Sequence, residues 1–410
     1  MSRSARPLLV VVGGADPVYR GYCFEQAAAA YPLALIDAKP PSGVQHLVVD
    51  HEVADTQDPQ AVVAAGLALA ERHPIAGVVT WDEYALVPAA ELAARLGVTG
   101  NSAEAMTACR DKATSRRRFA EHGVPSAIST RVHTLTEATL VARFTGFPVV
   151  LKPSSHAASI GVVRVDTVEE LPAAWEFAVA GAGEQGPEGS GVLVEEYLDG
   201  PEVSVECVTR GGVTTALAVT RKEVAFAPYF EEVGHTVDAG DPLLDEVAPV
   251  AAQAVRALGV TDGVQHVEMR LTASGPRIIE VNARIGGDLI GELVRLATGL
   301  DLPRIAADVA CGTAPGLTPT VHATAAIKIL YPPAGGVLSE RSLAAVPGPQ
   351  YPWLHRVTWL REVGERVVLP PAGDLDTSRV GFLLVTADSP AAARDRLSFL
   401  ADALTLSVTP

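Results

Sequence analysis

The segment from Val264 to Arg284 restricts the fold more than any other part of the chain, because apolar and polar side chains alternate along it on both sides of a short turn. The turn is Ala273-Ser274-Gly275-Pro276. The apolar positions are Val267, Met269 and Leu271 before the turn and Ile279, Val281 and Ala283 after it. A period of two on both sides of a turn predicts a β-hairpin with one apolar and one polar face.

The polar face of this hairpin carries opposed acids. A fold about Ser274 predicts these facing pairs: Glu268 with Glu280, His266 with Asn282, Val267 with Val281, and Met269 with Ile279. Two carboxylates that face each other across strands repel unless a cation lies between them. Carboxylate and amide oxygens suit Mg²⁺ or Mn²⁺, so Glu268, Glu280 and Asn282 are candidate metal ligands. The alternative is a solvent-facing hairpin whose carboxylates splay apart.

The first hundred residues alternate short apolar runs with helical patterns, which predicts a parallel sheet with helices on both faces. The expected strands are Leu8 to Val12, Leu33 to Ile36, Leu47 to Val49 and Gly77 to Thr80, and the expected helices are Pro59 to Arg72 and Glu83 to Leu96. Gly13-Gly14 suggests a tight strand-to-helix turn, because the segment lacks the G-x-G-x-x-G fingerprint of a dinucleotide site. Further along, Gly181 to Gly191 is rich in Gly, Pro, Glu and Ser and is expected to be an exposed loop.

Charge and composition exclude several classes of partner. A net charge of −16 argues against nucleic acid and anionic lipid, and the basic cluster Arg116 to Arg118 is interpreted as a solvated helix face. The start of the chain reads as a first strand and not as a signal peptide, and no run is long enough to span a membrane. The four cysteines are widely separated, which favours reduced thiols and a cytoplasmic protein.

Three further segments carry signals for phosphate or nucleotide binding. Lys152 ends the buried strand that follows Phe147, and a Ser-rich loop from Ser154 to Gly161 comes next, a combination able to hold phosphate. An ordinary surface hairpin is the alternative. Lys112 lies on a predicted helix, where an exposed lysine would be unremarkable. Glu202 begins a strand after Gly200-Pro201 and is placed to meet ribose hydroxyls or an exocyclic amine, although exposed strand ends also carry Glu for solubility.

Taken in order, these segments resemble the ATP-grasp superfamily over roughly Arg110 to Gly312, and within it the L-amino acid ligases, which make dipeptides and include the bacilysin-forming alanine–anticapsin ligase. The resemblance implies an ATP-grasp fold with α/β and α+β parts. It divides the chain into a Rossmann-like parallel α/β domain (1–102), a lid subdomain (103–198), a large subdomain (199–320) and a C-terminal mixed subdomain (321–410).

The resemblance also implies roles for individual residues. Lys112 and Lys152 look like the lysines that contact nucleotide phosphates, and Ser159 falls in the loop that closes over them. The segment that reads adenine matches Glu195, Glu196, Tyr197 and Leu198. Glu268, Glu280 and Asn282 match the magnesium ligands, in agreement with the hairpin pattern, and Arg284 matches the arginine that stabilises the acyl phosphate.

For the substrates, the resemblance points to an acid in the first domain, an E-x-x-H motif and a histidine before the first metal ligand. These fall on Glu83, on Glu232 with His235, and on His266, while Gly287 is expected to let substrate approach the backbone. The implied activity joins a carboxylate to an amine with ATP and Mg²⁺ (or Mn²⁺), and a homodimer is implied.

Three other functions stay open. The first is another ATP-grasp ligase of the biotin-carboxylase-like or purine-pathway type, whose phosphate machinery would look the same. The second is an NAD-dependent oxidoreductase built on the first domain, which the missing glycine fingerprint disfavours. The third is a nucleotide-binding regulator without turnover.

Overall fold

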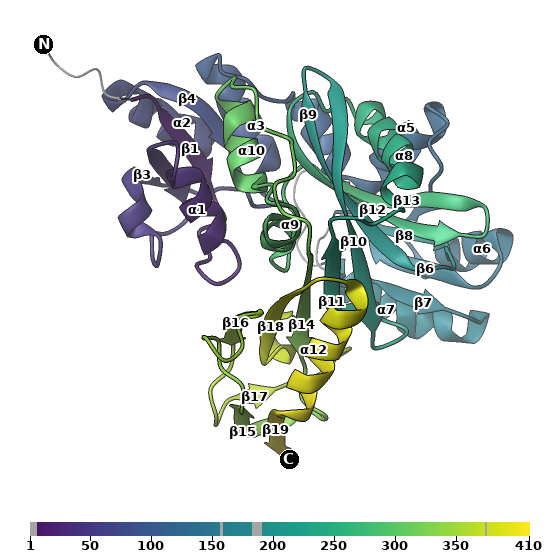
Figure 1. Ribbon diagram of the computed structural model, residues 1–410. Helices are drawn as coiled ribbons and strands as arrows, with labels where there is room; N and C mark the ends of the chain where they lie inside the picture. Colours follow the sequence, from purple (N-terminus) through teal and green to yellow (C-terminus); the bar gives the residue numbers. More distant parts are fainter. Residues whose placement is uncertain (1–5, 156–158, 183–190, 374) are drawn as a thin grey trace, which may run out of the picture.

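A four-stranded parallel sheet forms the first part of the computed structural model, which describes residues 6–155, 159–182, 191–373 and 375–410 (Figure 1). The strand order is β3-β2-β1-β4, and every pairing is parallel. The strands are β1 (Leu8–Val12), β2 (Leu33–Asp37), β3 (Val48–Val53) and β4 (Ile75–Val79), and the helices are α1 (Gly21–Ala28), α2 (Pro59–Arg72) and α3 (Leu86–Leu96). The predicted parallel sheet is therefore confirmed.

The boundaries differ from the predicted ones where polar side chains override the apolar pattern. Helix α3 begins at Leu86 and not at Glu83, because the Asp82 carboxylate accepts a hydrogen bond from the Tyr84 amide at 2.9 Å and holds a turn there. Strand β3 runs on to Val53, since an edge strand tolerates polar residues on its exposed side. Gly13 and Gly14 both adopt positive φ, as a tight turn requires.

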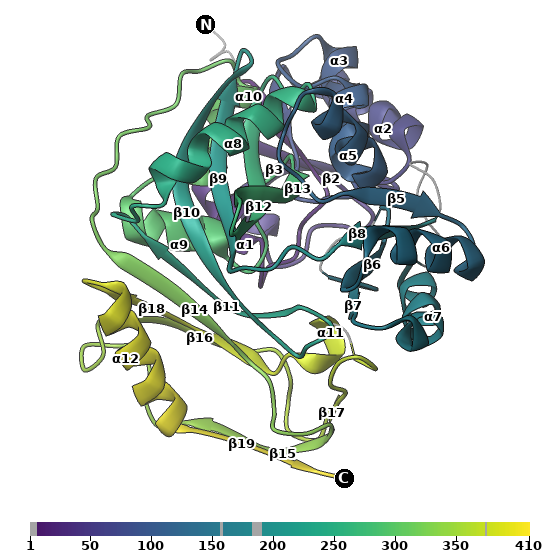
Figure 2. The same cartoon turned by 90° about the vertical axis from the view of Figure 1, so that its right-hand side faces the viewer.

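A second four-stranded sheet has the order β5-β8-β6-β7 and is named the lid sheet, because it lies in the part of the chain predicted to be a lid (Figure 2). Its strands are β5 (Ser129–Val132), β6 (Val149–Pro153), β7 (Val163–Val165) and β8 (Val192–Glu196), and helices α6 (Leu135–Thr145) and α7 (Leu171–Ala182) cover it. Two helices lead into it, α4 (Ala103–Arg110) and α5 (Lys112–Glu121). Gly181 belongs to α7, and most of the loop expected after it, 183–190, lies outside the described residues.

The largest sheet is antiparallel and has eight strands, in the order β13-β12-β9-β10-β11-β14-β18-β16. The strands are β9 (Glu202–Arg210), β10 (Val213–Ala225), β11 (Glu231–Asp238), β12 (Gly263–Thr272), β13 (Gly275–Asn282), β14 (Thr324–Leu330), β16 (Leu354–Trp359) and β18 (Gly381–Ala387). Three helices lie against it: α8 (Leu244–Ala257), α9 (Ile290–Thr298) and α10 (Leu302–Ala310). One hydrophobic core joins α9 and α10 to the first sheet through Leu9 and Leu35, and to α1 through Phe24.

A small sheet completes the C-terminal part, in the lower region of Figure 2, with order β17-β15-β19. It contains β15 (Gly336–Leu343), β17 (Arg366–Val367) and β19 (Leu404–Thr409), beside α11 (Leu375–Ser378) and α12 (Pro390–Asp402). The eight-stranded sheet crosses residue 320, because β14, β16 and β18 extend it beyond β11. The subdivision at 102, 198 and 320 stays a prediction. No helix among the described residues is long and apolar enough to cross a membrane.

The predicted hairpin is β12 and β13, and its register is confirmed over half its length. Glu268 faces Glu280 and His266 faces Asn282. The predicted pairing of Met269 with Ile279 is wrong, because a two-residue turn joins Thr272 to Gly275 and Met269 faces Ile278. Ile279 is therefore the extra residue of a β-bulge, which restores the register before the opposed acids.

Candidate functional site

A cleft of about 310 Å³ lies between the lid sheet and the eight-stranded sheet, and most of the predicted site residues line it. They are Lys112, Lys152, Ser159, Glu195, Glu196, Tyr197, Leu198, Glu202, Glu232, His266, Glu268, Glu280, Asn282, Arg284 and Gly287. Glu83 and His235 lie just behind the wall, each in contact with a lining residue. Residues far apart in the sequence are thus gathered at one place.

The two opposed carboxylates of the hairpin point into this cleft, and lysines compensate them. Lys222 Nζ lies 2.9 Å from Glu268 Oε1, and Lys112 Nζ lies 2.9 Å from Glu280 Oε1. Burial raises the pKa of Glu268, but Lys222 and His266 outweigh it and hold that pKa well below its usual range. Both lysines use the same oxygen of their partner, Oε1. Glu268, Glu280 and Asn282 line the cleft with side chains of the oxygen chemistry that Mg²⁺ prefers, and their role as metal ligands stays a prediction.

Lys152 belongs to a buried cluster with Glu195 and Arg116. The Glu195 carboxylate lies 2.7 Å from Lys152 Nζ and 2.9 Å from Arg116 Nε, and Arg116 Nη2 also donates to the Ile279 carbonyl at 2.7 Å. Burial favours a neutral Glu195, yet Arg116 and Lys152 lower its pKa to about 2. Burial lowers the pKa of Lys152, while Glu195 opposes that effect. Glu195 therefore orients Lys152 at the cleft wall.

Arg116 corrects the prediction of a solvated basic face. It is 6% exposed, while Arg117 is exposed and Arg118 pairs with Glu104 at the surface. The basic triplet looked uniform in the sequence, but residues one apart on a helix point in different directions. Only the first of the three turns inward, against the bulge at Ile279.

The segment expected to read adenine leaves β8 and crosses to β9. The Cζ atom of Arg164 lies over the Tyr197 ring, 4.3 Å from the ring centre. The ring centres of Tyr197 and Phe230 are 6.2 Å apart. Glu196 pairs with Arg277, and Glu202 lies 2.9 Å from Arg270. Gly200 follows at φ +142°, and a Cβ there would lie 2.0 Å from the Leu271 carbonyl oxygen. The crossing therefore packs tightly on the hairpin strand.

Arg284 and Glu83 form an ion pair at the opposite end of the cleft. Arg284 Nε lies 2.8 Å from Glu83 Oε2, and Nη1 donates to the Ile285 carbonyl at 2.9 Å. Burial raises the pKa of Glu83, and Arg284 opposes that effect. The carboxylate of Glu83 thus fixes the direction in which Arg284 points.

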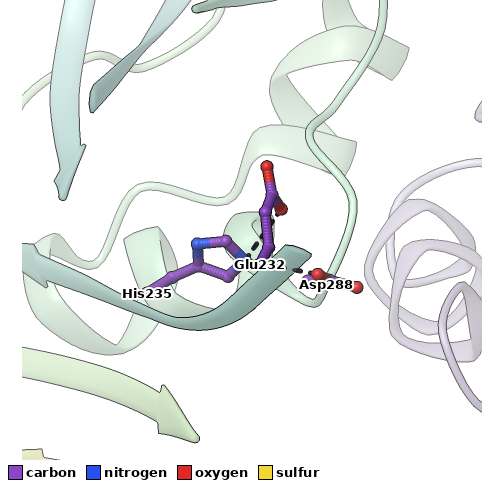
Figure 3. A group of neighbouring side chains, drawn as sticks. All are labelled: Glu232, His235 and Asp288. Carbon is purple, nitrogen blue, oxygen red and sulfur yellow. Dashed lines mark hydrogen bonds and ion pairs between the residues drawn. The ribbon is translucent and has the colours of Figure 1, made fainter. Parts of the chain in front are cut away.

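The E-x-x-H motif places His235 between two acids. Its Nε2 lies 3.3 Å from Glu232 Oε2 and 3.3 Å from Asp288 Oδ2, as Figure 3 shows. Burial lowers the pKa of His235, but the two carboxylates raise it above its usual value, which favours a protonated ring.

These three side chains have the composition of a metal site, with ligand atoms within 4.8 Å of one another. Lys222 binds Glu232 at 2.6 Å and Arg379 binds Asp288 at 2.7 Å, so both acids already carry a cation. A protonated His235 has no lone pair to give a metal, and a divalent ion would add further positive charge beside Lys222, Arg379 and the charged ring. The cluster therefore fits a hydrogen-bonded charge network better than a metal site.

His266, expected to meet substrate, is occupied on both ring nitrogens. Nδ1 lies 2.9 Å from Glu206, which is completely buried, and Nε2 lies 3.0 Å from Glu268. Burial opposes the charged ring, but Glu206 raises the pKa of His266 to about 9. In this arrangement His266 supports Glu268.

Four residues that line the cleft were not assigned to the site from the sequence: Arg20, Arg116, Lys222 and Arg379. Asp288 was not assigned either, although its neighbour Gly287 was. Asp288 and Leu289 both have positive φ, which is uncommon for such residues and marks a special turn. Arg379 had no local signal, because only the tertiary fold brings it to the cleft.

Comparison with known proteins shows which domain family and which relatives this chain resembles. A family model described as an ATP-grasp domain matches residues 145–292. An uncharacterised protein, y4rH, of Sinorhizobium fredii is 30% identical over 305 residues, which are 72% of this chain and 62% of that protein. Alanine–anticapsin ligase of Bacillus subtilis is 27% identical over 68% of this chain and 62% of its own length. This chain thus spans about three fifths of these two relatives.

The crystal structure of an L-amino acid ligase from Bacillus licheniformis matches the whole of both chains with a TM-score of 0.81 and 23% sequence identity, which establishes a shared fold. Residues 145–292 therefore match an ATP-grasp domain, as the sequence predicted, and the chain as a whole shares the fold of this ligase.

Proposed function

We propose that this chain is an ATP-dependent, Mg²⁺-requiring ligase that activates a carboxylate as an acyl phosphate and joins it to an amine, with release of ADP and phosphate. The observation that carries the proposal is that Lys112, Lys152 and Arg284 line one cleft with the opposed acids Glu268 and Glu280, and that Lys112 pairs with Glu280. Cations beside a magnesium donor set are the equipment of phosphoryl transfer. Amino acids are the proposed substrates, by analogy with the relatives named above.

The residues of this chain supply positioning and charge. Lys112 and Lys152 bind phosphate oxygens, and the crossing at Tyr197 and Leu198 receives the base. Mg²⁺, when bound by Glu268, Glu280 and Asn282, neutralises negative charge on the phosphates. Arg284, aimed by Glu83, stabilises the oxyanion that forms when the amine attacks the acyl carbonyl.

The first step couples ATP to the acid: a carboxylate oxygen attacks the γ-phosphorus, the bond to the bridging oxygen breaks, and ADP leaves. In the second step the amine nitrogen attacks the acyl carbon and a C–N bond forms. The C–O bond to phosphate breaks, and phosphate leaves with its electron pair. The amine proton passes to solvent or to a nearby carboxylate. The homodimer stays a prediction.

A matrix of paired amino acids with ATP and Mg²⁺ tests the proposal. We expect ADP and phosphate in equal amounts, together with a product whose mass equals the two amino acids less one water. Formation of AMP and pyrophosphate would contradict the acyl-phosphate route. ATP turnover with bicarbonate alone would favour a carboxylase-like function, and nucleotide binding without turnover for any pair would favour a regulator.

A further inference from the structure

Two arginines from the ends of the chain line the cleft beside Arg284, and neither has a role in the function proposed above. Arg20 precedes α1, and Arg379 lies between α11 and β18. Both lie outside residues 145–292, the part that matches the ATP-grasp domain. Residues outside the shared nucleotide machinery are the natural place for substrate recognition.

Arg379 is held rigidly with donors to spare. Its Nη1 and Nη2 lie 2.7 Å and 3.0 Å from the two oxygens of Asp288, and its Nε donates to the Tyr331 hydroxyl at 3.2 Å. The side chain is 3% exposed. A guanidinium has five N–H donors, so these three contacts and a hydrogen bond with Tyr19 still leave donor capacity for a ligand.

Arg20 lacks a counter-ion among the described residues. Its Nη1 donates to the Gly286 carbonyl at 2.8 Å, a neutral acceptor, and no carboxylate of the described chain forms an ion pair with it. By contrast, Arg284 is compensated by Glu83 and Arg379 by Asp288. A largely enclosed, uncompensated cation is costly, and an anionic ligand removes that cost.

Arg20 and Arg379 flank the same loop, from Gly286 to Asp288. Arg20 binds its first residue and Arg379 its last. Tyr19, the neighbour of Arg20, hydrogen-bonds to Arg379 and packs its ring 5.9 Å from that of Phe382 on β18. The two guanidinium groups therefore belong to one end of the cleft, next to the arginine assigned to the acyl group.

We propose that Arg20 and Arg379 form a subsite for the free carboxylate of the amino acid that donates the amine. This inference rests on the proposed function. The carboxylate to be activated must lie beside Lys112, Arg284 and the metal ligands. The phosphates of ATP are bound by Lys112 and Lys152. A planar guanidinium matches a carboxylate in geometry, so a second carboxylate is the anion that this end of the cleft fits.

The first experiment needs only the unmodified protein. The best amine donor from the amino-acid matrix is compared with its own α-carboxamide, which keeps the amine and the side chain but loses the negative charge. We expect kcat/KM for the carboxamide to be lower by about a hundredfold, in line with charged hydrogen bonds lost at a buried site. Equal use of both donors would overturn the subsite. Absence of ADP with every pair would instead overturn the proposed ligase function.

The second experiment tests whether Arg20 and Arg379 cause the preference for the carboxylate donor over its carboxamide. Arg20→Gln and Arg379→Gln should each raise KM for the amine donor about tenfold or more. KM for ATP should change less than about twofold, and discrimination against the carboxamide should shrink. Arg72→Gln and Arg341→Gln are matched controls, because these arginines form ion pairs with Asp50 and Glu362 outside the cleft.

Retention of full discrimination by both cleft variants would overturn the assignment. An equal rise in KM for ATP and for the amine donor would do so too, since it would indicate a general loss of structure. If Arg379→Gln fails to fold, Arg20→Gln and the carboxamide comparison decide the question.

Discussion

Individual carboxylates in the cleft form ion pairs with lysines from distant segments of the chain. Lys222 on β10 binds Glu268, and Lys112 at the start of α5 binds Glu280. Asp111 fixes the second lysine by capping α5, since its carboxylate accepts from the Ala113 amide at 3.1 Å. Because these lysines already compensate the acids, Mg²⁺ should bind weakly until nucleotide phosphates bring additional negative charge.

Glu280→Gln should lower turnover by about a thousandfold, because the amide keeps the shape of the side chain but supplies no negative charge to the metal or to Lys112. ADP release under saturating ATP measures the loss. Glu104→Gln is the matched control, since Glu104 pairs with Arg118 on the surface. Near-normal turnover in Glu280→Gln would remove Glu280 from the metal site.

The depressed pKa of Glu195 predicts a pH-dependent stability. Its pKa falls from 4.5 to about 2 on folding, so it stabilises the fold fully above about pH 4.5 and loses that contribution as pH falls toward 2. The full effect is up to about 3 kcal/mol. Thermal melts of the unmodified protein and of Glu195→Gln should therefore differ clearly at pH 7 and approach each other as the pH falls through 4.5 toward 2. A difference that does not depend on pH would contradict this explanation.

At the scale of elements, the hairpin shows what alternation can and cannot predict. The pairs Glu268–Glu280 and His266–Asn282 followed from the period of two and the position of the turn. The bulge at Ile279 did not, because Ile278 and Ile279 are both apolar and the pattern does not decide which of them faces Met269. The prediction that Arg116 is solvated was wrong for a related reason. Which residue of a basic triplet turns inward depends on the element packed against the helix, and here that element is the bulge at Ile279.

At the crossing from β8 to β9, we expect substitution of Gly200 to destabilise the fold. Gly200→Ala should cost about 2 kcal/mol or more, because its Cβ would collide with the Leu271 carbonyl oxygen and the backbone at φ +142° is strained for any other residue. The midpoint of thermal unfolding measures the loss. Gly316→Ala is the control, because nothing lies within 4 Å of a Cβ at Gly316. Equal midpoints for the two variants would show that the crossing can relax.

At the scale of the whole molecule, the cleft is built by the lid, the eight-stranded sheet, and single residues from both ends of the chain. The parallel sheet at the start was predictable, because its strands are short and apolar. The convergence of Arg20, Asp288 and Arg379 was not, since it depends on contacts between residues 91 and 266 positions apart, which no local pattern encodes.

A ligand that binds surfaces from several parts at once should stabilise the whole fold. At a hundred times its Kd, ADP with Mg²⁺ should add about 3 kcal/mol and raise the melting temperature. Mg²⁺ alone should shift it little, and EDTA should remove most of the shift seen with ADP. Glu280→Gln should lose this dependence on Mg²⁺ yet keep some response to ADP. An equally large shift with Mg²⁺ alone would mean that the metal site is complete without phosphate.

Strand β11 pairs with β14 from Gly234–Lys328 to Asp238–Thr324, and this pairing determines where the chain can be shortened. A fragment that stopped at residue 320 would keep the pairing of β11 with β10 but leave unpaired the backbone groups that face β14, and exposed strand edges recruit other chains. The same cut would discard Arg379 and release Asp288 from its clamp. Expression trials that trim the C-terminus should therefore yield aggregated material with a misshapen pocket, and not a smaller working enzyme.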